Sequence, residues 1–104
     1  MRIDLHVHTW HSPDSLSQPR AILEIMDRRG IDMVAITDHN AIDGALEMAA
    51  LAPQRVIVGE EIATTQGEII GLFLVAPVAP RMSPEETVAA IHGQGGVVYI
   101  PHVA

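Results

Sequence analysis

Three residues near the start of the chain, Asp4, His6 and His8, have the types and the spacing of metal ligands. They alternate with apolar residues in the first expected strand, and side chains on a strand point alternately to its two faces. The alternation predicts that these three side chains share one face, with Leu5 and Val7 on the other. Imidazole and carboxylate are ligands that divalent transition metals readily accept, so this strand predicts a metal site.

A similar pattern returns three times along the chain. Short, largely β-branched runs, typical of strands buried on both faces of a parallel sheet, lead into polar residues. The runs are 33–36 before Thr37-Asp38-His39, 56–58 before Gly59-Glu60-Glu61, and 97–100 before Pro101-His102. In parallel α/β folds the site lies where the carboxyl ends of the strands meet. Because unpaired ionisable groups are costly to bury, the pattern predicts that four strand ends bring His, Asp and Glu together.

Helices are expected between these strands. The first should run from about Pro19 to Gly30 and bury an apolar stripe. A shorter helix should carry Ile42 and Leu46 among its apolar residues. The segment Ser83-Pro84-Glu85-Glu86 is a capping box with proline at the first helical position. Residues 64–67 have the composition of a hairpin turn, which predicts one antiparallel insertion in a mostly parallel sheet.

In order and spacing, these motifs resemble the PHP superfamily, the polymerase and histidinol phosphatase domain. The matching motifs are Asp4-Leu5-His6-Val7-His8-Thr9 with His11-Ser12-Pro13-Asp14-Ser15, then Ile36-Thr37-Asp38-His39-Asn40, Gly59-Glu60-Glu61-Ile62 and Ile100-Pro101-His102. The first motif alone is moderately specific, because amidohydrolases share His-x-His. Its combination with Thr-Asp-His and the later Glu and Pro-His is specific, and the match covers essentially the whole chain.

The resemblance implies a distorted (β/α) barrel of about seven strands that binds two or three divalent ions of zinc, manganese or iron. It implies that His6 and His8 hold the first metal and that Glu61 bridges metals. His102 would belong to the second metal. Asp14 and His39 would belong to the third. Glu61 and His39 are the candidate catalytic residues.

Other polar residues near the motifs are weighed as ligands or as neighbours of ligands. Glu68 falls where many relatives place a metal-binding histidine, so its carboxylate either replaces the imidazole or leaves that position unused. His11 lies in a loop beside the site, where the family usually has an aromatic or polar residue. The family motif at this place is Gly-x-Glu, in which Glu61 is the conserved glutamate and Glu60 the variable residue. Glu60 is therefore expected to be a solvated charge. Asp4 and Asp38 are expected to orient histidine ligands.

One departure from the family limits the expected fold. The chain ends at Ala104 without the later Asp-x-His that supplies the family's last ligands. We therefore expect a single α/β domain over residues 1–104, a half of the distorted (β/α)7 PHP-type barrel that is C-terminally truncated relative to the family. Open sheet edges invite pairing and uncovered apolar surface marks interfaces, so a homo-oligomer is expected.

Composition narrows the class of protein. Forty-eight per cent of residues are hydrophobic, which excludes disorder, and no apolar run is long enough to span a membrane. The chain has no cysteine, which excludes disulfides and thiolate sites. The N-terminal segment does not resemble a secretory signal peptide, so a cytoplasmic location is expected. The net charge of −7 and six scattered arginines argue against a nucleic-acid-binding patch, and an anionic substrate would depend on bound cations.

Three functions are compatible with these residues. A metal-dependent phosphoesterase would hydrolyse phosphomonoesters or nucleotide phosphodiesters by metal-bound hydroxide, with a phosphorylated small molecule or nucleotide as its partner. The alternative is a catalytically incomplete metal-binding PHP fragment or structural domain, because the Asp-x-His ligands are absent. A hydrolase of the amidohydrolase kind is less favoured, since many members need a carbamylated lysine and this chain has no lysine.

Overall fold

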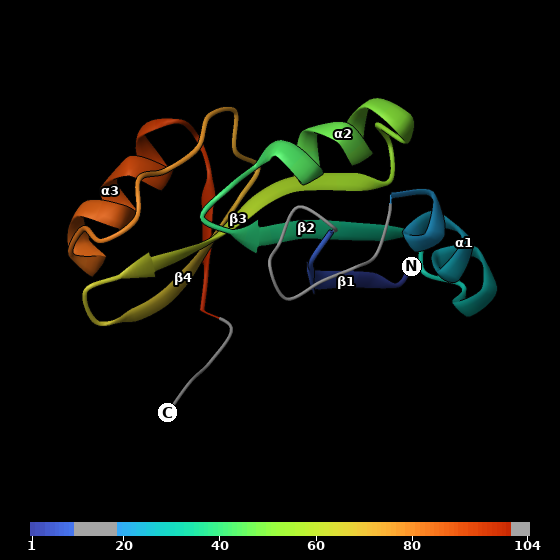
Figure 1. Cartoon of the computed structure of the whole chain (residues 1–104), viewed down its shortest axis with the longest axis horizontal. Coiled ribbons are helices and arrows are strands. Elements are labelled where there is room, and N and C mark those ends of the chain that lie inside the picture. The colour runs from blue at the N-terminus through green and yellow to red at the C-terminus, as the bar shows by residue number, and fades with distance from the viewer. Residues whose placement is uncertain (10–18, 101–104) are drawn as a thin grey trace.

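The expected alternation of strands and helices is present in the computed structural model, which describes residues 1–9 and 19–100. Within these residues five strands form one sheet and three helices accompany it (Figure 1). In chain order the elements are β1 (Ile3–Val7), α1 (Pro19–Arg29), β2 (Met33–His39), α2 (Asp43–Leu51), β3 (Val56–Thr64), β4 (Gly67–Leu72), α3 (Pro84–Gly93) and β5 (Val97–Tyr99).

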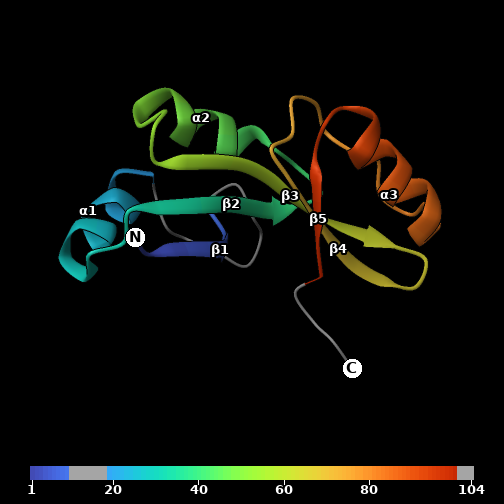
Figure 2. The ribbon, with the colours of Figure 1, turned by 180° about the vertical axis from the view of Figure 1, so that it is seen from behind.

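The sheet has the order β1-β2-β3-β4-β5. β1, β2 and β3 are parallel, β4 returns antiparallel to β3, and β5 is antiparallel to β4. β5 therefore runs in the same direction as the first three strands. The sheet is strongly twisted: β5 stands upright in a view where β1, β2 and β3 run across it (Figure 2). This confirms the expected α/β sheet, mostly parallel with a hairpin insertion.

The hairpin between β3 and β4 turns at the predicted residues. Gly67 has φ +114°, a backbone conformation that favours glycine. The Thr64 hydroxyl donates a hydrogen bond to the Gly67 carbonyl at 2.6 Å, which closes the turn. The hairpin folds Glu68 back towards Glu61, since the paired strands place Glu61 opposite Ile70, two residues beyond Glu68.

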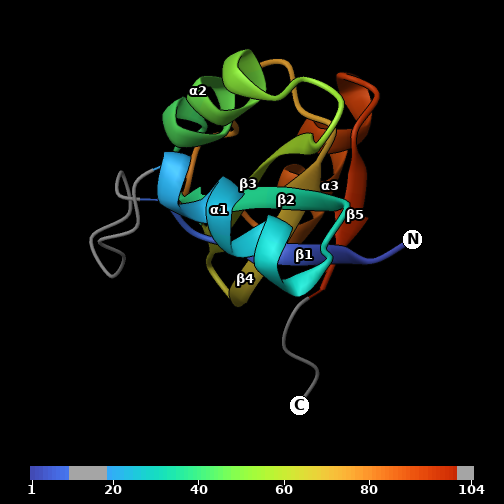
Figure 3. The same ribbon diagram turned by 90° about the vertical axis from the view of Figure 1, so that its right-hand side faces the viewer.

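The three helices cover one face of the sheet. Beneath α1 and α2, which lie beside each other (Figure 3), one core cluster contains Met26, Ile36 and Met48. Beneath α3, a second cluster contains Ile62 and Ile91. Both clusters contact Val58, so they form one continuous layer between the helices and the sheet. We call this side the helix-covered face.

The opposite side, here the inner face, has a smaller apolar cluster of its own. It is formed by buried Ala35, Ile57, Ile70 and Leu72, with Leu5, Met33 and Tyr99 packed against it. None of the described helices contributes to this cluster. The candidate ligands of β2, β3 and β4 continue this face towards the carboxyl ends of the parallel strands, which is where the sequence places a site.

Two helix boundaries agree with their predicted signals. α1 ends at Arg29, and Gly30 follows with φ +65°, a conformation that costs glycine little. Ser83 caps α3 through a complete capping box with Glu86, with Pro84 at the first helical position. None of the helices in the described part of the chain is both long and apolar enough to cross a membrane.

Two details of burial differ from expectation. Leu46 was expected among the apolar residues of α2, but its side chain is 47% exposed and the helix packs through Ala45 and Met48 instead. β5 was expected to be buried on both faces, yet Val97 is 51% exposed. β5 is an edge strand of the described sheet, so one of its sides has no neighbouring strand.

Candidate metal centre

The register of β1 slips by one residue where its histidines begin. Asp4 pairs with Val34 and Val7 pairs with Ile36, so two residues of β1 lie opposite the single residue Ala35. Leu5 consequently packs on the inner face, while Val7 packs into the helix-covered core. The prediction that Leu5 and Val7 share a face was wrong, because strict alternation fails at such a bulge. Bulges often re-aim a side chain at a site.

Despite the bulge, His6 and His8 converge on one carboxylate from β3. The Nε2 atoms of His6 and His8 lie 2.8 Å apart. Glu61 Oε2 lies 2.9 Å from His6 Nε2, and Glu61 Oε1 lies 3.7 Å from His8 Nε2. These three ligand atoms can hold one metal ion, and we call His6, His8 and Glu61 the two-histidine group.

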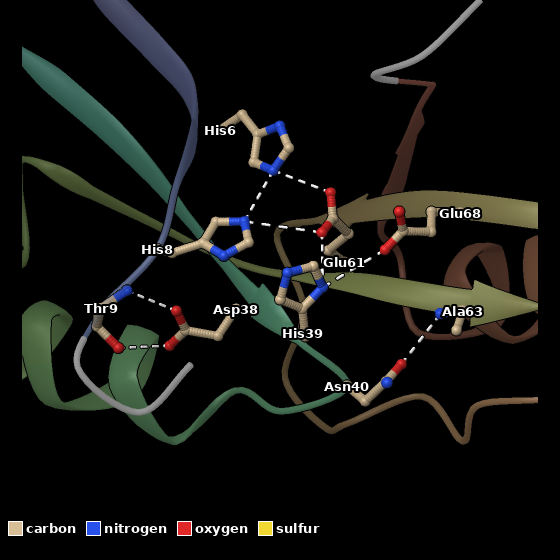
Figure 4. A network of polar contacts seen from close by, with 9 residues as sticks. All are labelled: His6, His8, Thr9, Asp38, His39, Asn40, Glu61, Ala63 and Glu68. Atoms are coloured by element: carbon tan, nitrogen blue, oxygen red, sulfur yellow. Dashed lines mark hydrogen bonds and ion pairs between the residues drawn. The ribbon is translucent and has the colours of Figure 1, made fainter. Parts of the chain in front are cut away.

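A second group shares the same carboxylate. His39 Nδ1 lies 2.7 Å from Glu61 Oε1 and 3.4 Å from Glu68 Oε2. Figure 4 shows these side chains pointing toward one another from β2, β3 and β4. One ligand atom from each residue lies within reach of a single ion, and we call His39, Glu61 and Glu68 the two-carboxylate group. The chain therefore brings Glu68 into the site.

Glu61 is the common member of the two groups, and its oxygens have different nearest histidines. Oε2 lies closest to His6 and Oε1 closest to His39. The side chain is only 2% exposed, and within the described residues Oε2 makes no hydrogen bond of acceptable geometry. A buried oxygen of this kind is costly unless a cation or a donor satisfies it. The arrangement suits a carboxylate that bridges two ions.

The charge balance of the site also fits bound cations. Burial raises the pKa of the Glu61 carboxyl above its ordinary value, and the Glu68 carboxylate raises that pKa as well. Positive charge on His6, His8 or His39 acts in the opposite direction. Burial and the neighbouring Glu68 carboxylate both disfavour the ionised form of Glu61. A divalent cation bound beside Glu61 would therefore stabilise that form. Imidazole nitrogens and carboxylate oxygens are suitable donors for such an ion.

Asp38 connects the site to the chain that precedes it. Its Oδ1 accepts a hydrogen bond from the Thr9 backbone N–H at 2.6 Å, and its Oδ2 accepts one from the Thr9 hydroxyl at 2.5 Å (Figure 4). Both residues are fully buried. Since Thr9 follows His8 and Asp38 precedes His39, this pair holds the ends of β1 and β2 together. That Asp38 orients a histidine ligand remains a proposal.

The side chain of Asp4 also accepts a hydrogen bond from the backbone. Its Oδ1 accepts a hydrogen bond from the backbone N–H of His6 at 3.1 Å. The carboxylate thus supports the strand where the register slips. We retain its influence on the orientation of His6 as a proposal.

Asn40 is a site-supporting residue to which the sequence reasoning gave no role. It has φ +52°, and its side-chain Oδ1 accepts a hydrogen bond from the Ala63 N–H at 3.0 Å. Its own N–H donates to the Glu61 carbonyl at 2.9 Å. Asparagine tolerates this left-handed conformation better than most residues. Its position directly after His39 was the available signal, and its contacts tie the end of β2 to β3.

Glu60 differs from its predicted environment. It was expected to be a solvated charge, but it is fully buried on the helix-covered face, opposite to Glu61. The Val78 backbone N–H donates to Glu60 Oε1 at 2.7 Å, and burial raises the pKa of Glu60 to about 7. The loop before α3 covers this carboxyl, and the local sequence of β3 could not reveal that packing.

Three of the predicted ligands, His11, Asp14 and His102, lie outside the described residues. Their expected roles therefore stay predictions. The structure brings together five of the residues named from sequence, which are His6, His8, His39, Glu61 and Glu68.

Solved structures of other proteins resemble this fold. One is a two-domain protein from Bacteroides vulgatus containing a predicted PHP-like metal-dependent phosphoesterase, with a TM-score of 0.76 and 20% identity over 94% of this chain and 34% of that chain. Another is an amidohydrolase from Chromobacterium violaceum with bound sulfate and no metal, with a TM-score of 0.63 and 27% identity over 89% of this chain and 33% of that chain. The chain thus spans about a third of either structure. The first, at 20% identity, shows similarity of fold alone.

Sequence comparison identifies the family. An uncharacterized protein of Methanocaldococcus jannaschii is 45% identical over 115 residues, an alignment that covers 98% of this chain and 67% of the relative. The model of the PHP domain matches residues 4–92, which include both ligand groups. With this match over most of its length, the chain belongs to the PHP domain family.

Proposed function

We propose that this chain is a metal-dependent phosphoesterase domain that hydrolyses phosphomonoesters or nucleotide phosphodiesters. The observation that carries the proposal is the convergence of three histidines and two carboxylates at one end of the inner face. Two or three divalent ions of zinc, manganese or iron would bind there. Membership of the PHP family supports this reaction class.

The protein's own contribution is to hold ligands in fixed positions around a shared carboxylate. Glu61 lies between His6 and His39, and its burial limits the orientations available to its oxygens. The contacts of Asp38 and Asn40 keep the ends of β1, β2 and β3 in register. Divalent ions held in this way lower the pKa of a bound water and offset the negative charge of a phosphate ester.

Access and charge are consistent with an anionic substrate. His6, His39 and Glu68 are 30%, 28% and 37% exposed, so this side of the centre is open to a ligand. The chain carries a net charge of −7 and would repel a phosphate from most of its surface. Cations at the centre would therefore determine where such a substrate binds.

The test is hydrolysis measured together with metal content. Metal-free protein would be loaded with zinc, manganese or iron and assayed with an aryl phosphate, a bis-aryl phosphodiester and an aryl amide. We expect metal-dependent release from a phosphate substrate, and loss of both metal and turnover in the double variant His6→Ala/His8→Ala. His92→Ala, at the exposed end of α3, is the control and should behave like the parent.

Each contrary result selects a different alternative. Stoichiometric metal without hydrolysis of any substrate would favour a metal-binding domain without turnover. Hydrolysis of the amide alone would favour the amidohydrolase reaction, which the name of the Chromobacterium violaceum neighbour suggests for that protein. Equal metal content in the double variant and its parent would refute the proposed ligands.

A further inference from the structure

The two ligand groups differ in the atoms that they offer. The two-histidine group presents two imidazole nitrogens, from His6 and His8, with one oxygen of Glu61. Among residues 1–9 and 19–100, the two-carboxylate group presents one imidazole nitrogen, from His39, with one oxygen each from Glu61 and Glu68. The groups share Glu61: Oε2 lies closest to His6, whereas Oε1 lies closest to His39 and 3.7 Å from His8 Nε2.

Ligand type controls which ion a site prefers. Imidazole suits zinc, iron and copper, whereas carboxylate oxygen suits magnesium, calcium and manganese. Zinc binds more tightly than manganese to most sites made of nitrogen and oxygen. The quantity that distinguishes the groups is therefore the ratio of zinc affinity to manganese affinity at each group. This ratio should fall as oxygen ligands replace nitrogen ligands.

Charge and exposure add to the same difference. The two-carboxylate group has two acidic side chains, and the Glu68 carboxylate is 37% exposed. The two-histidine group has one acidic side chain, the shared Glu61, and its histidines His6 and His8 are 30% and 15% exposed. A strongly hydrated ion that keeps several waters is better accommodated where a ligand is exposed and the charge is more negative.

We propose that the two groups select different ions, zinc or iron(II) at the two-histidine group and manganese at the two-carboxylate group. This inference rests on the proposed metal-dependent function and specifies its metals. Glu68 determines this difference in ion preference. Each group contains Glu61 and at least one histidine, and the third ligand is a second histidine in one group and Glu68 in the other. The centre is then a mixed pair bridged by Glu61.

Competition between two ions tests this proposal without measuring activity. Metal-free protein would receive one equivalent of zinc and an excess of manganese, and bound manganese would be measured by electron paramagnetic resonance after removal of free ions. We expect about one zinc and one manganese per chain. Calorimetric titrations of each ion would give the zinc-to-manganese affinity ratio at each group.

Variants of Glu68 provide the decisive comparison. Glu68→His supplies a nitrogen ligand, so the preference for zinc over manganese at this group should rise by about tenfold or more. Glu68→Gln removes the charge and should weaken manganese binding by about the same factor while leaving the first zinc site within a few fold. Glu85→Gln, on the exposed first turn of α3, should change neither ion.

The results separate this inference from the proposed function. If Glu68→His and Glu68→Gln leave manganese binding unchanged, or if the parent retains zinc but no manganese in the competition, the inference is overturned. The proposed function would still stand if His6→Ala/His8→Ala removed metal and turnover. If the parent bound neither ion, both would fall.

Discussion

Thr9 and Asp38 form a buried pair that joins the chain after His8 to the residue before His39. The Thr9 N–H and hydroxyl donate to the two oxygens of Asp38 at 2.6 and 2.5 Å. The pair fits only because Gly44 at the start of α2 has no side chain. A Cβ at Gly44 would overlap both Thr9 Oγ1 and Asp38 Oδ2. The relative position of β1 and β2 thus depends on three residues outside the two ligand groups, which are Thr9, Asp38 and Gly44.

Loss of the Asp38 carboxylate should weaken both folding and metal binding. Asp38→Ala leaves the buried Thr9 donors without these acceptors, which should lower the free energy of unfolding by about 2–4 kcal/mol and zinc affinity by about tenfold. Asp38→Asn keeps an acceptor for the Thr9 N–H and should retain more of both. Urea unfolding of metal-free protein and a zinc titration give the two quantities. Unchanged zinc affinity in folded Asp38→Ala would show that the pair does not position ligands.

Gly44→Ala should be destabilising even though alanine favours helices. The added methyl overlaps the Thr9 and Asp38 side chains, and forced overlap in a packed interior costs about 1–3 kcal/mol. Gly93→Ala in α3 is the matched control, because its added Cβ meets no atom within 4 Å. That control should be neutral or stabilised by up to about 1 kcal/mol. Equal stabilities of the two variants in thermal unfolding would contradict the close fit at Gly44.

Divalent metal should stabilise the folded chain through the two groups around Glu61. An ion at about 100 times its dissociation constant adds about 2.7 kcal/mol per site when it binds only the native state. For a domain of this size this raises the melting temperature by roughly 10 °C or more. Scanning calorimetry with and without zinc measures the effect. His6→Ala/His8→Ala should lose most of this increase, and an undiminished increase would place the bound zinc elsewhere.

The buried carboxyl of Glu60 should make stability depend on pH. Its pKa is about 7 in the folded chain and 4.5 ordinarily, so between these values the folded state holds a proton that the unfolded state has released. Stability from this group is present below pH 4.5 and lost as pH rises to 7. Glu60→Gln removes the titration. Relative to the parent, its free energy of unfolding should therefore increase by on the order of 3 kcal/mol from pH 5 to pH 8.

Urea unfolding across that pH range checks this expectation with Glu85→Gln as a control. Glu85 lies on an exposed turn, so its variant should track the parent at every pH. A Glu60→Gln difference that is the same at pH 5 and pH 8 would show that Glu60 does not titrate in this range.

The edges of the described sheet lead to a prediction about assembly. β1 and β5 are its edge strands, and Ile3 and Val97 on them are 47% and 51% exposed. Unpaired strand edges with apolar side chains favour association, so we expect a homo-oligomer. Light scattering at micromolar concentration gives the mass. Ile3→Lys should shift the population towards the monomer, and a monomeric parent would contradict the expectation.

Local sequence alone predicted the helices and strands and most of the residues that the structure brings together at the candidate site. The capping box at Ser83 and the stop at Gly30 act within a few residues, so their effect does not depend on the rest of the fold. Apolar runs that end in His39 and Glu61 predicted parallel strands, and the carboxyl ends of such strands lie at one edge of a sheet. The meeting of His39 with Glu61 follows from that geometry.

Other features were decided only by the tertiary structure. The bulge of β1 places Val7 in the core beneath the helices and Leu5 in the cluster of the inner face, to which none of the described helices contributes. Glu60 is buried because a distant loop packs over it through Val78. Glu68 reaches His39 only because the β3–β4 hairpin folds back. Such contacts join residues far apart in the chain, so their energies depend on packing that local patterns do not encode.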